Sequence, residues 1–203
     1  MDVADEHLPF ELSILKSPFN AAVLGDAMAD RIFGELPGVP EGTLFDDRTE
    51  LSKAGVHRPR QAGICGGKGE GAESIVLSGG YEDDTDSGDV IVYTGHGGNI
   101  PRTATQYQDQ ELDRQNMALV ISCEDRLPVR VVRGSKHKSA WSPEAGYVYS
   151  GLYRVVRWWE QRGKSGFKVF RFELRKIGSD AEAELAEQPC QSPVDGEFLR
   201  QAP

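Results

Sequence analysis

Residues 74–94 of this chain read SIVLSGGYEDDTDSGDVIVYT, and this stretch carries the strongest indication of the fold. Its two ends, Ser74–Leu77 and Val90–Tyr93, are short runs rich in β-branched residues, which predicts two strands. Glycines flank the loop between them, so the backbone is expected to turn sharply on either side of it. The stretch therefore predicts two strands joined by a structured acidic loop.

The loop itself, Gly79–Gly88, holds four acidic residues within five positions. A charge run of this kind is most often a solvated turn. A calcium site is not supported, because the ligand spacing and the closing glutamate of an EF-hand loop are absent. The alternative is a slot for a flat, hydrogen-bonding ligand, because Tyr81 precedes the acids and Tyr93 ends the following strand.

Outward from this stretch the sequence remains mostly β-like. Apolar residues at helical spacing predict one amphipathic helix at Gln108–Leu119. Apolar and charged residues alternate in Lys168–Arg175, which predicts a half-buried strand, and Gly163–Gly166 predicts the hairpin turn before it. Further strands are expected at Leu119–Ser122, Val129–Val132 and Tyr149–Trp158. The expected fold class is α+β, mainly β, with a strongly bent, barrel-like sheet and a few flanking helices.

The chain is expected to have three segments. Residues 31–177 form the β-rich body, in which the glycine-rich stretch Pro59–Gly71 reads as a flexible excursion. Residues 1–30 read as an N-terminal extension with one helix that begins at Ser17, because serine is a good cap and proline follows it. Residues 178–203 are rich in Ala, Glu, Gln and Pro, which predicts an acidic, flexible tail.

The net charge of −9 taken alone argues against a nucleic-acid partner. The charge is unevenly distributed, however. Residues 70–125 carry −10, residues 126–177 carry +10, and each end of the chain carries −5. An acidic block therefore lies beside a basic block, and the basic block is a candidate phosphate-facing surface.

The three cysteines are odd in number, far apart and outside CxxC spacing: Cys65, Cys123 and Cys190. They predict reduced thiols in a cytosolic or nuclear setting rather than a zinc site. No apolar run reaches 18 residues, so no membrane span is expected. The first 30 residues lack the basic region of a signal peptide.

Motifs of common enzyme classes are absent, including GxSxG, HExxH, the Walker A loop and the zinc-deaminase pattern. The histidines have no second ligand at metal spacing, and each is interpreted as a surface or loop residue: His7, His57, His96 and His137. We therefore expect no catalytic residue, no metal and no cofactor in this chain.

Between residues 31 and 177 the sequence resembles, in unbroken order, the SRA (SET- and RING-associated, or YDG) domain, whose fold is PUA-like. The matching motifs are FGELPG (33–38), GTLF (42–45), GVHRP (55–59), AGI (62–64), LSGGYEDD (77–84), YTG (93–95), QDQ (108–110), PVRVVR (128–133) and GKSGF (163–167). The resemblance implies a domain that binds double-stranded DNA carrying 5-methylcytosine or a related base by flipping that base into a pocket.

By this resemblance, Tyr81 and Tyr93 are the two aromatic faces between which the flipped base stacks. Such stacking returns roughly 1–3 kcal/mol per base, against a flipping cost of a few kcal/mol. Asp84 accepts the exocyclic N4 hydrogens of cytosine, and a carboxylate acceptor there should reject the keto group of thymine. Backbone N–H groups of the same loop address N3 and O2. The pocket and its niche for the 5-substituent are completed by Ser78, Gly79, Gly80, Thr94 and His96.

Two loops are implied to enter the duplex. A thumb with Arg60 and Gln61 at its tip fills the vacated space through the minor groove. A finger at Gly95–Arg102, with Asn99 and Arg102 as candidate contacts, faces the major groove. The finger lacks the Asn-Lys-Arg tip of animal hemimethylation readers, so strict preference for hemimethylated CpG is not expected. The family's Tyr-Asp-Gly motif is Tyr149-Ser150-Gly151 here and is expected to be a structural turn.

The function expected is a non-catalytic reader of modified cytosine. Its phosphate contacts would come from the basic block: Arg130, Arg133, Lys136, Lys138 and Lys164. The first alternative is the recognition part of a modification-dependent restriction endonuclease, with the nuclease in a missing part of the chain or on a partner. The second is a metal- or small-molecule-binding β domain using the acidic loop. The expected location is the bacterial cytoplasm, at the nucleoid, or the nucleus in a eukaryote.

Overall fold

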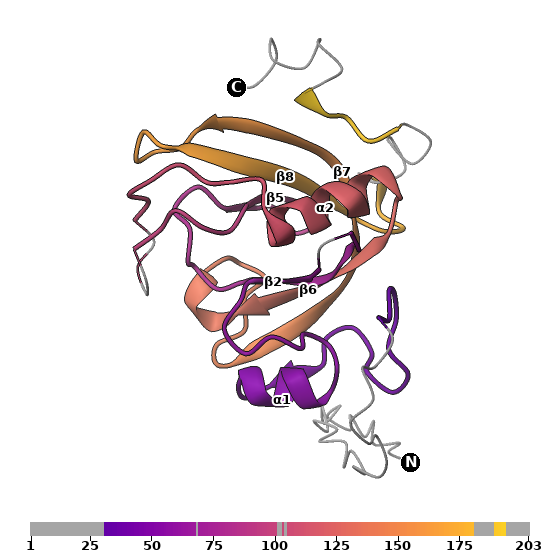
Figure 1. Ribbon diagram of the computed structural model, residues 1–203. Coiled ribbons are helices and arrows are strands. Elements are labelled where there is room, and N and C mark those ends of the chain that lie inside the picture. Colours follow the sequence, from indigo (N-terminus) through magenta and orange to yellow (C-terminus); the bar gives the residue numbers. More distant parts are fainter. Residues whose placement is uncertain (1–30, 68, 101–102, 104, 181–188, 194–203) are drawn as a thin grey trace, which may run out of the picture. The chain divides into compact units, whose positions relative to one another are not determined.

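The computed structural model describes residues 31–67, 69–100, 103, 105–180 and 189–193 (Figure 1). The helix expected to begin at Ser17 and the finger residue Arg102 lie outside the described residues. The elements are β1 (Leu44–Phe45), α1 (Arg48–Lys53), β2 (Ile64–Gly66), β3 (Ala72–Leu77), β4 (Thr85–Asp86), β5 (Val90–Thr94), α2 (Arg114–Glu124), β6 (Pro128–Gly134), the 3-10 helix η1 (Ser135–His137), β7 (Tyr147–Arg162) and β8 (Lys168–Lys176).

The eight strands form one sheet in the order β2-β3-β6-β7-β8-β5-β4, with β1 alongside β7. The pair β3–β6 is parallel, and the other described pairs are antiparallel. The expected mainly β fold is confirmed. In the described part of the chain the outer strands β2 and β4 do not pair with each other, so the sheet is open rather than closed into a barrel.

The sheet bends along its long strand β7, whose 16 residues pair first with β6 and then with β8. One bulge lies between Arg130 and Val132 and a second between Val155 and Arg157. Bulges increase the local twist and bend the strand that carries them. In Figure 1, β7 accordingly curves from the side of β6 to the side of β8.

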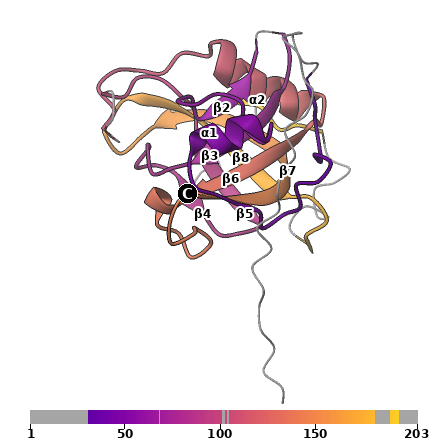
Figure 2. The same cartoon turned by 90° about the horizontal axis from the view of Figure 1, so that it is seen from below.

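Both faces of the central strands are buried, each in its own core. On β3, Ile75 and Leu77 belong to the larger core with Leu119 of α2, whereas Val76 points to a smaller core with Leu51 of α1. This burial on two sides explains the short apolar runs Ile75–Leu77 in β3 and Val131–Val132 in β6. Seen from below, α1 lies in front of β3 and β6 (Figure 2).

The expected strands are present, each somewhat longer than its sequence pattern, except for Leu119–Ser122, which is wrong because these residues lie inside α2. The helix begins only at Arg114 because Asp113 caps it and accepts a hydrogen bond from the Gln115 N–H. The excursion 59–71 contains β2, and the motif 149–151 lies within β7 rather than in a turn. The short helix α1, capped by Asp47, was not expected.

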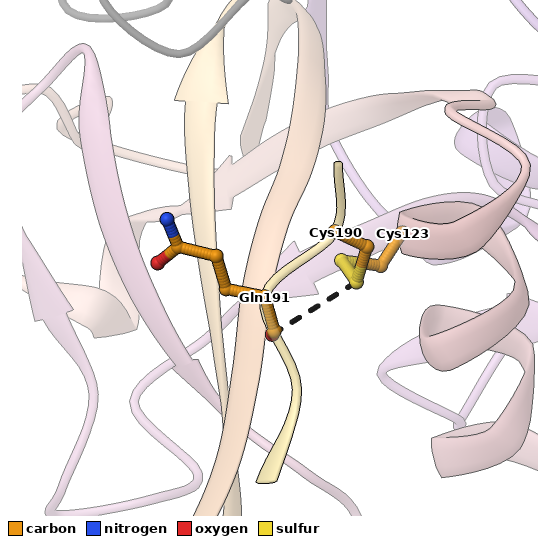
Figure 3. The surroundings of a disulfide bond; sticks show 3 residues. All are labelled: Cys123, Cys190 and Gln191. Carbon is orange, nitrogen blue, oxygen red and sulfur yellow. Dashed lines mark hydrogen bonds between the residues drawn. A yellow bond between two sulfur atoms is a disulfide. The ribbon is translucent and has the colours of Figure 1, made fainter. Parts of the chain in front are cut away.

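The expectation of three reduced cysteines is wrong, because Cys123 at the end of α2 forms a disulfide with Cys190 (Figure 3). Cys65 is a buried free thiol. Next to the disulfide, the backbone of Gln191 pairs with β7, with bonds to Val156 O (3.1 Å) and from Trp158 N (3.0 Å). A part of the expected flexible tail is therefore held against the body. Within the described residues, no helix is long and apolar enough to cross a membrane.

Candidate nucleic-acid interface

The aspartates of the acidic loop have different partners. Asp83 accepts a hydrogen bond from the backbone N–H of Lys164 at 3.1 Å, which ties the loop to the β7–β8 hairpin. Asp86 accepts two bonds of 2.8 Å from Arg133 and one of 3.1 Å from His137. Burial acts to raise the pKa of Asp86, but the bonds from His137 and Arg133 hold it well below its usual range. Both carboxylates are thus structural.

Asp84 is the aspartate left for a ligand. Within the described part of the chain its one hydrogen bond comes from the backbone N–H of Thr94, which lies 2.8 Å from Oδ1. This bond orients the carboxylate and leaves acceptor capacity unused. Burial raises the pKa of Asp84 to about 6, although the bond from Thr94 and the charge of Arg171 oppose the rise.

The two tyrosines lie close to Asp84. Burial raises the pKa of Tyr81 to about 12, and burial also raises the pKa of Tyr93; the charge of Asp84 contributes to both shifts. Tyr81 is half-buried and its hydroxyl accepts a bond from Gly97 N at 2.9 Å. Tyr93 is only 2% exposed. Tyr81 is therefore the more accessible aromatic face in this structure.

The turn before Tyr81 requires glycine. Gly79 has a φ of +70°, and a Cβ there would lie 2.5 Å from the carbonyl oxygen of Lys136. This close approach packs the turn against η1. Ser78 and Gly80 are partly exposed on either side of it, while Thr94 on the neighbouring β5 is fully buried.

The predicted thumb presents its tip to solvent, because Arg60 and Gln61 are both exposed. The histidine that precedes it is not a surface residue as expected. His57 is fully buried and hydrogen-bonded to Ser74 Oγ and Ala62 O, each at 2.9 Å. The thumb loop is therefore anchored to the protein core through His57.

The finger is fastened near its base. His96 Nε2 lies 2.6 Å from Oδ1 of Asp113, the cap of α2, and the backbone N–H of His96 donates to Asn116 Oδ1 at 2.9 Å. Asn99 pairs with Gln106 across the finger, and its Oδ1 lies 3.4 Å from the Tyr81 hydroxyl. The finger thus packs beside Tyr81, the more accessible of the two tyrosines.

Two of the expected phosphate contacts are wrong. Arg130 and Arg133 are only 1% and 3% exposed. Arg130 donates to three backbone carbonyls, those of Ile32, Gly34 and Val56, and Arg133 is occupied by Asp86. A phosphate outside the protein cannot reach either guanidinium.

The three lysines of the expected set remain available for phosphate. Lys136 and Lys138, on and after η1, are exposed beside the Gly79 turn. Lys164, on the β7–β8 hairpin, is also exposed and its Nζ donates to Glu82 O. The lysines therefore lie on two sides of the acidic loop.

Sequence reasoning missed the buried polar groups behind the site. Arg171 donates from Nη2 to Asp83 O at 2.6 Å, and Arg48 donates to Pro59 O and Ala62 O in the thumb. Glu73 accepts bonds from Arg58, Arg31 and Ile32 N at the base of the thumb. Their only signal was a charged residue within an apolar run, as at Arg171 and Glu73.

Comparison with known proteins gives consistent matches. The family described as the SAD/SRA domain matches residues 32–180. The E3 ubiquitin-protein ligase UHRF1 of Rattus norvegicus is 44% identical over 171 residues, which cover 74% of this chain and 22% of the relative. The H3 lysine-9 specific histone-lysine N-methyltransferase SUVH6 of Arabidopsis thaliana is 46% identical over 167 residues, covering 77% of this chain and 21% of the relative. This chain thus spans about a fifth of these relatives' length.

Solved structures give the same picture. The modification-dependent TagI restriction endonuclease matches with a TM-score of 0.71 and 47% identity over 76% of this chain and 55% of that chain. The SRA domain of SUVH5 bound to fully hydroxymethylated CG DNA matches with a TM-score of 0.63 and 45% identity, over 73% of this chain and 95% of that chain.

Proposed function

Because this chain belongs to the SAD/SRA domain family, we propose that it reads 5-methylcytosine, or a related 5-modified cytosine, in double-stranded DNA by flipping the base into a pocket. The single observation that carries the proposal is Asp84, a half-buried carboxylate with unused acceptor capacity that lies close to Tyr81 and Tyr93. No catalytic step is assigned to the chain, and its working compartment is the one that holds DNA: the cytoplasm of a bacterium or the nucleus.

The chemistry of the pocket favours cytosine over thymine. The N4 amino group of a flipped cytosine donates to an acceptor, and ionised Asp84 offers only acceptors. Thymine would place its O4 acceptor against the same carboxylate, and a buried unpaired polar group costs about 1–3 kcal/mol. Stacking on Tyr81 compensates for lost stacking in the duplex. Ser78, Gly79, Gly80, Thr94 and His96 then surround the 5-substituent.

The exposed lysines supply the electrostatic part of binding. Lys136, Lys138 and Lys164 on both sides of the acidic loop are placed to contact phosphates flanking the flipped nucleotide. Contacts of this kind add affinity without sequence preference and weaken as salt rises. Preference for the modified base thus depends on Asp84 and the tyrosines rather than on the lysines.

The test is an affinity series at one stated salt concentration, using matched duplexes with cytosine, 5-methylcytosine or 5-hydroxymethylcytosine in one or both strands. Asp84→Asn should lower the preference for the modified base at least tenfold while weak non-specific binding persists. Asp89→Asn is the matched control, because this exposed carboxylate is in the same hairpin and loses the same charge. If the protein without substitutions binds all of these duplexes with equal affinity, the proposal is overturned.

A second candidate is the recognition part of a modification-dependent restriction endonuclease, which the match to the TagI enzyme favours. In that case the cleaving groups belong to another part of the protein or to a partner. Incubating the purified chain with methylated plasmid and Mg²⁺ or Mn²⁺ should give no nicking on its own. Nicking by the chain alone would show that it is itself a nuclease.

A further inference from the structure

The thumb loop is gripped from inside at both ends of its tip. A single nitrogen, Nη2 of Arg48 in α1, donates to Pro59 O at 3.2 Å and also to Ala62 O. These two carbonyls bracket Arg60 and Gln61, the exposed pair at the tip. One cation therefore fixes the separation of the two ends from which the tip projects.

His57 grips the same loop from the core. A carbonyl oxygen only accepts, so the 2.9 Å contact between Nε2 and Ala62 O requires a proton on Nε2. Nδ1 then accepts from the hydroxyl of Ser74 on β3. Burial, together with the positive charge of Arg48, lowers the pKa of His57 to about 3. The ring is therefore neutral and of one tautomer at physiological pH.

The end of the loop also touches the pocket. Gly63 O accepts a bond from Val76 N on β3 at 2.8 Å. A Cβ added at Gly63 would lie 2.6 Å from the hydroxyl oxygen of Tyr93, so the backbone leaves no room for a side chain there. The thumb therefore packs directly against Tyr93, and a shift of the loop would also displace the Tyr93 side chain.

We infer that Arg48 and His57 are positioning residues that hold Arg60 and Gln61 in the conformation that enters the duplex. The inference rests on the proposed base-flipping function and deepens it. A loop already in its bound conformation loses little conformational freedom on binding. Neither residue needs to touch DNA for this role, because both act through the carbonyls of Pro59 and Ala62.

A positioning role can be distinguished from a general loss of protein stability with a duplex in which the modified base is easier to flip, because the thumb should contribute less to its binding. A modified cytosine opposite an abasic site has no pairing partner, so less energy is needed to extrude it. The probes are two 5-methylcytosine duplexes, one fully paired and one with an abasic site opposite the modified base. Arg48→Gln should weaken binding to the paired duplex about tenfold and binding to the abasic duplex less than twofold.

Three further variants sharpen the test. Lys53→Gln, at the exposed end of the same helix, loses the same charge and should bind both duplexes like the unmodified chain. Gln61→Ala removes the inserted side chain and should reproduce the pattern of Arg48→Gln. The double variant Arg48→Gln/Gln61→Ala should be no weaker than Gln61→Ala, because both changes act on one step.

His57→Gln and Arg48→Lys provide independent variants if Arg48→Gln does not fold. The side-chain amide introduced by His57→Gln can still donate to Ala62 O, so the loss on the paired duplex should be smaller than that of His57→Ala. An equal loss on both duplexes, or an additive double variant, would overturn the positioning role while leaving the reader function standing. If the unmodified chain shows no preference for 5-methylcytosine, the reader function itself fails.

Discussion

The thumb and the finger lie near Tyr93 and Tyr81, respectively, but they are held by different kinds of interaction. The thumb is held by charged and buried groups: Arg48 and His57 bond the carbonyls on either side of its tip, and Glu73 lies at its base. The finger is held by neutral amides, because Gln106 and Gln110 donate to the carbonyls of Gly95 and Gly97.

The difference sets how freely each loop can change. Removing one partner of a buried ion pair costs roughly 3–5 kcal/mol, whereas a neutral hydrogen bond contributes about 1 kcal/mol. Substitution of the residues that hold the thumb should therefore lower the free energy of unfolding strongly, whereas substitutions in the finger should lower it only slightly.

The largest expected effect comes from breaking the base of the thumb. Glu73→Ala leaves Arg130 buried without its anion and also removes one partner of Arg58. We expect the free energy of unfolding to fall by about 3–5 kcal/mol, measured by urea denaturation. Glu70→Ala is the matched control, because this exposed acid also pairs with Arg31 and its loss should cost under about 0.5 kcal/mol. Equal losses would show that the thumb is not specially supported.

The disulfide sharpens the comparison because it touches neither loop. It closes a long segment of chain, since its cysteines are 67 positions apart. Cys190→Ser should lower the free energy of unfolding by about 2–4 kcal/mol and leave DNA affinity within twofold. A reducing agent should lower the free energy of unfolding of the protein without substitutions by the same amount and should leave that of the Cys190→Ser variant unchanged. A large change in DNA affinity would contradict the separation of the tail from both loops.

On the finger side, Gln110→Ala should have a smaller effect. It leaves Gly95 O and the Phe170 N–H without their partner inside the body, at about 1–3 kcal/mol. Hydrogen exchange should quicken at Gly97 and stay slow at Val76, which binds the thumb. Gln108→Ala, an exposed neighbour, serves as control. Faster exchange in both loops would mean that they are not independently held.

The smallest effect concerns the pH dependence that Asp84 gives to binding. Because its folded pKa is raised to about 6, its stabilising contribution is present below about pH 4 and is lost as the pH rises through 6. Protonation also lets the acid donate to a thymine O4. Discrimination between 5-methylcytosine and thymine paired with adenine should fall about tenfold from pH 7 to pH 5. Asp84→Asn should show no such dependence, and an unchanged ratio in the unmodified chain would exclude the role of this carboxylate.

Local patterns were enough to predict most strands, because β-branched runs and alternation are properties of a few neighbouring residues. Resemblance placed Asp84, Tyr81 and Tyr93, which lie close together in the structure. The charge count failed at Arg130 and Arg133, because burial depends on carbonyls and carboxylates brought from distant segments.

The same limit applies to α2 and to the cysteines. Gln110 lies within the predicted helix 108–119. In the structure its side chain bonds the backbone of Gly95 and Phe170, and the residue lies outside α2. The pairing of Cys123 with Cys190 follows from the return of the tail to β7, which no local pattern encodes.

The hydrogen bond from Arg171 to Asp83 O has a consequence for protein synthesis. These residues are 88 positions apart, and Thr94 on β5 pairs with Arg171 on β8, the last strand. The acidic loop therefore cannot take its final form until β8 has left the ribosome. A nascent chain that ends before Lys168 has the sequence of the pocket without its architecture, so the proposed base-reading site is assembled only after β8 has been made.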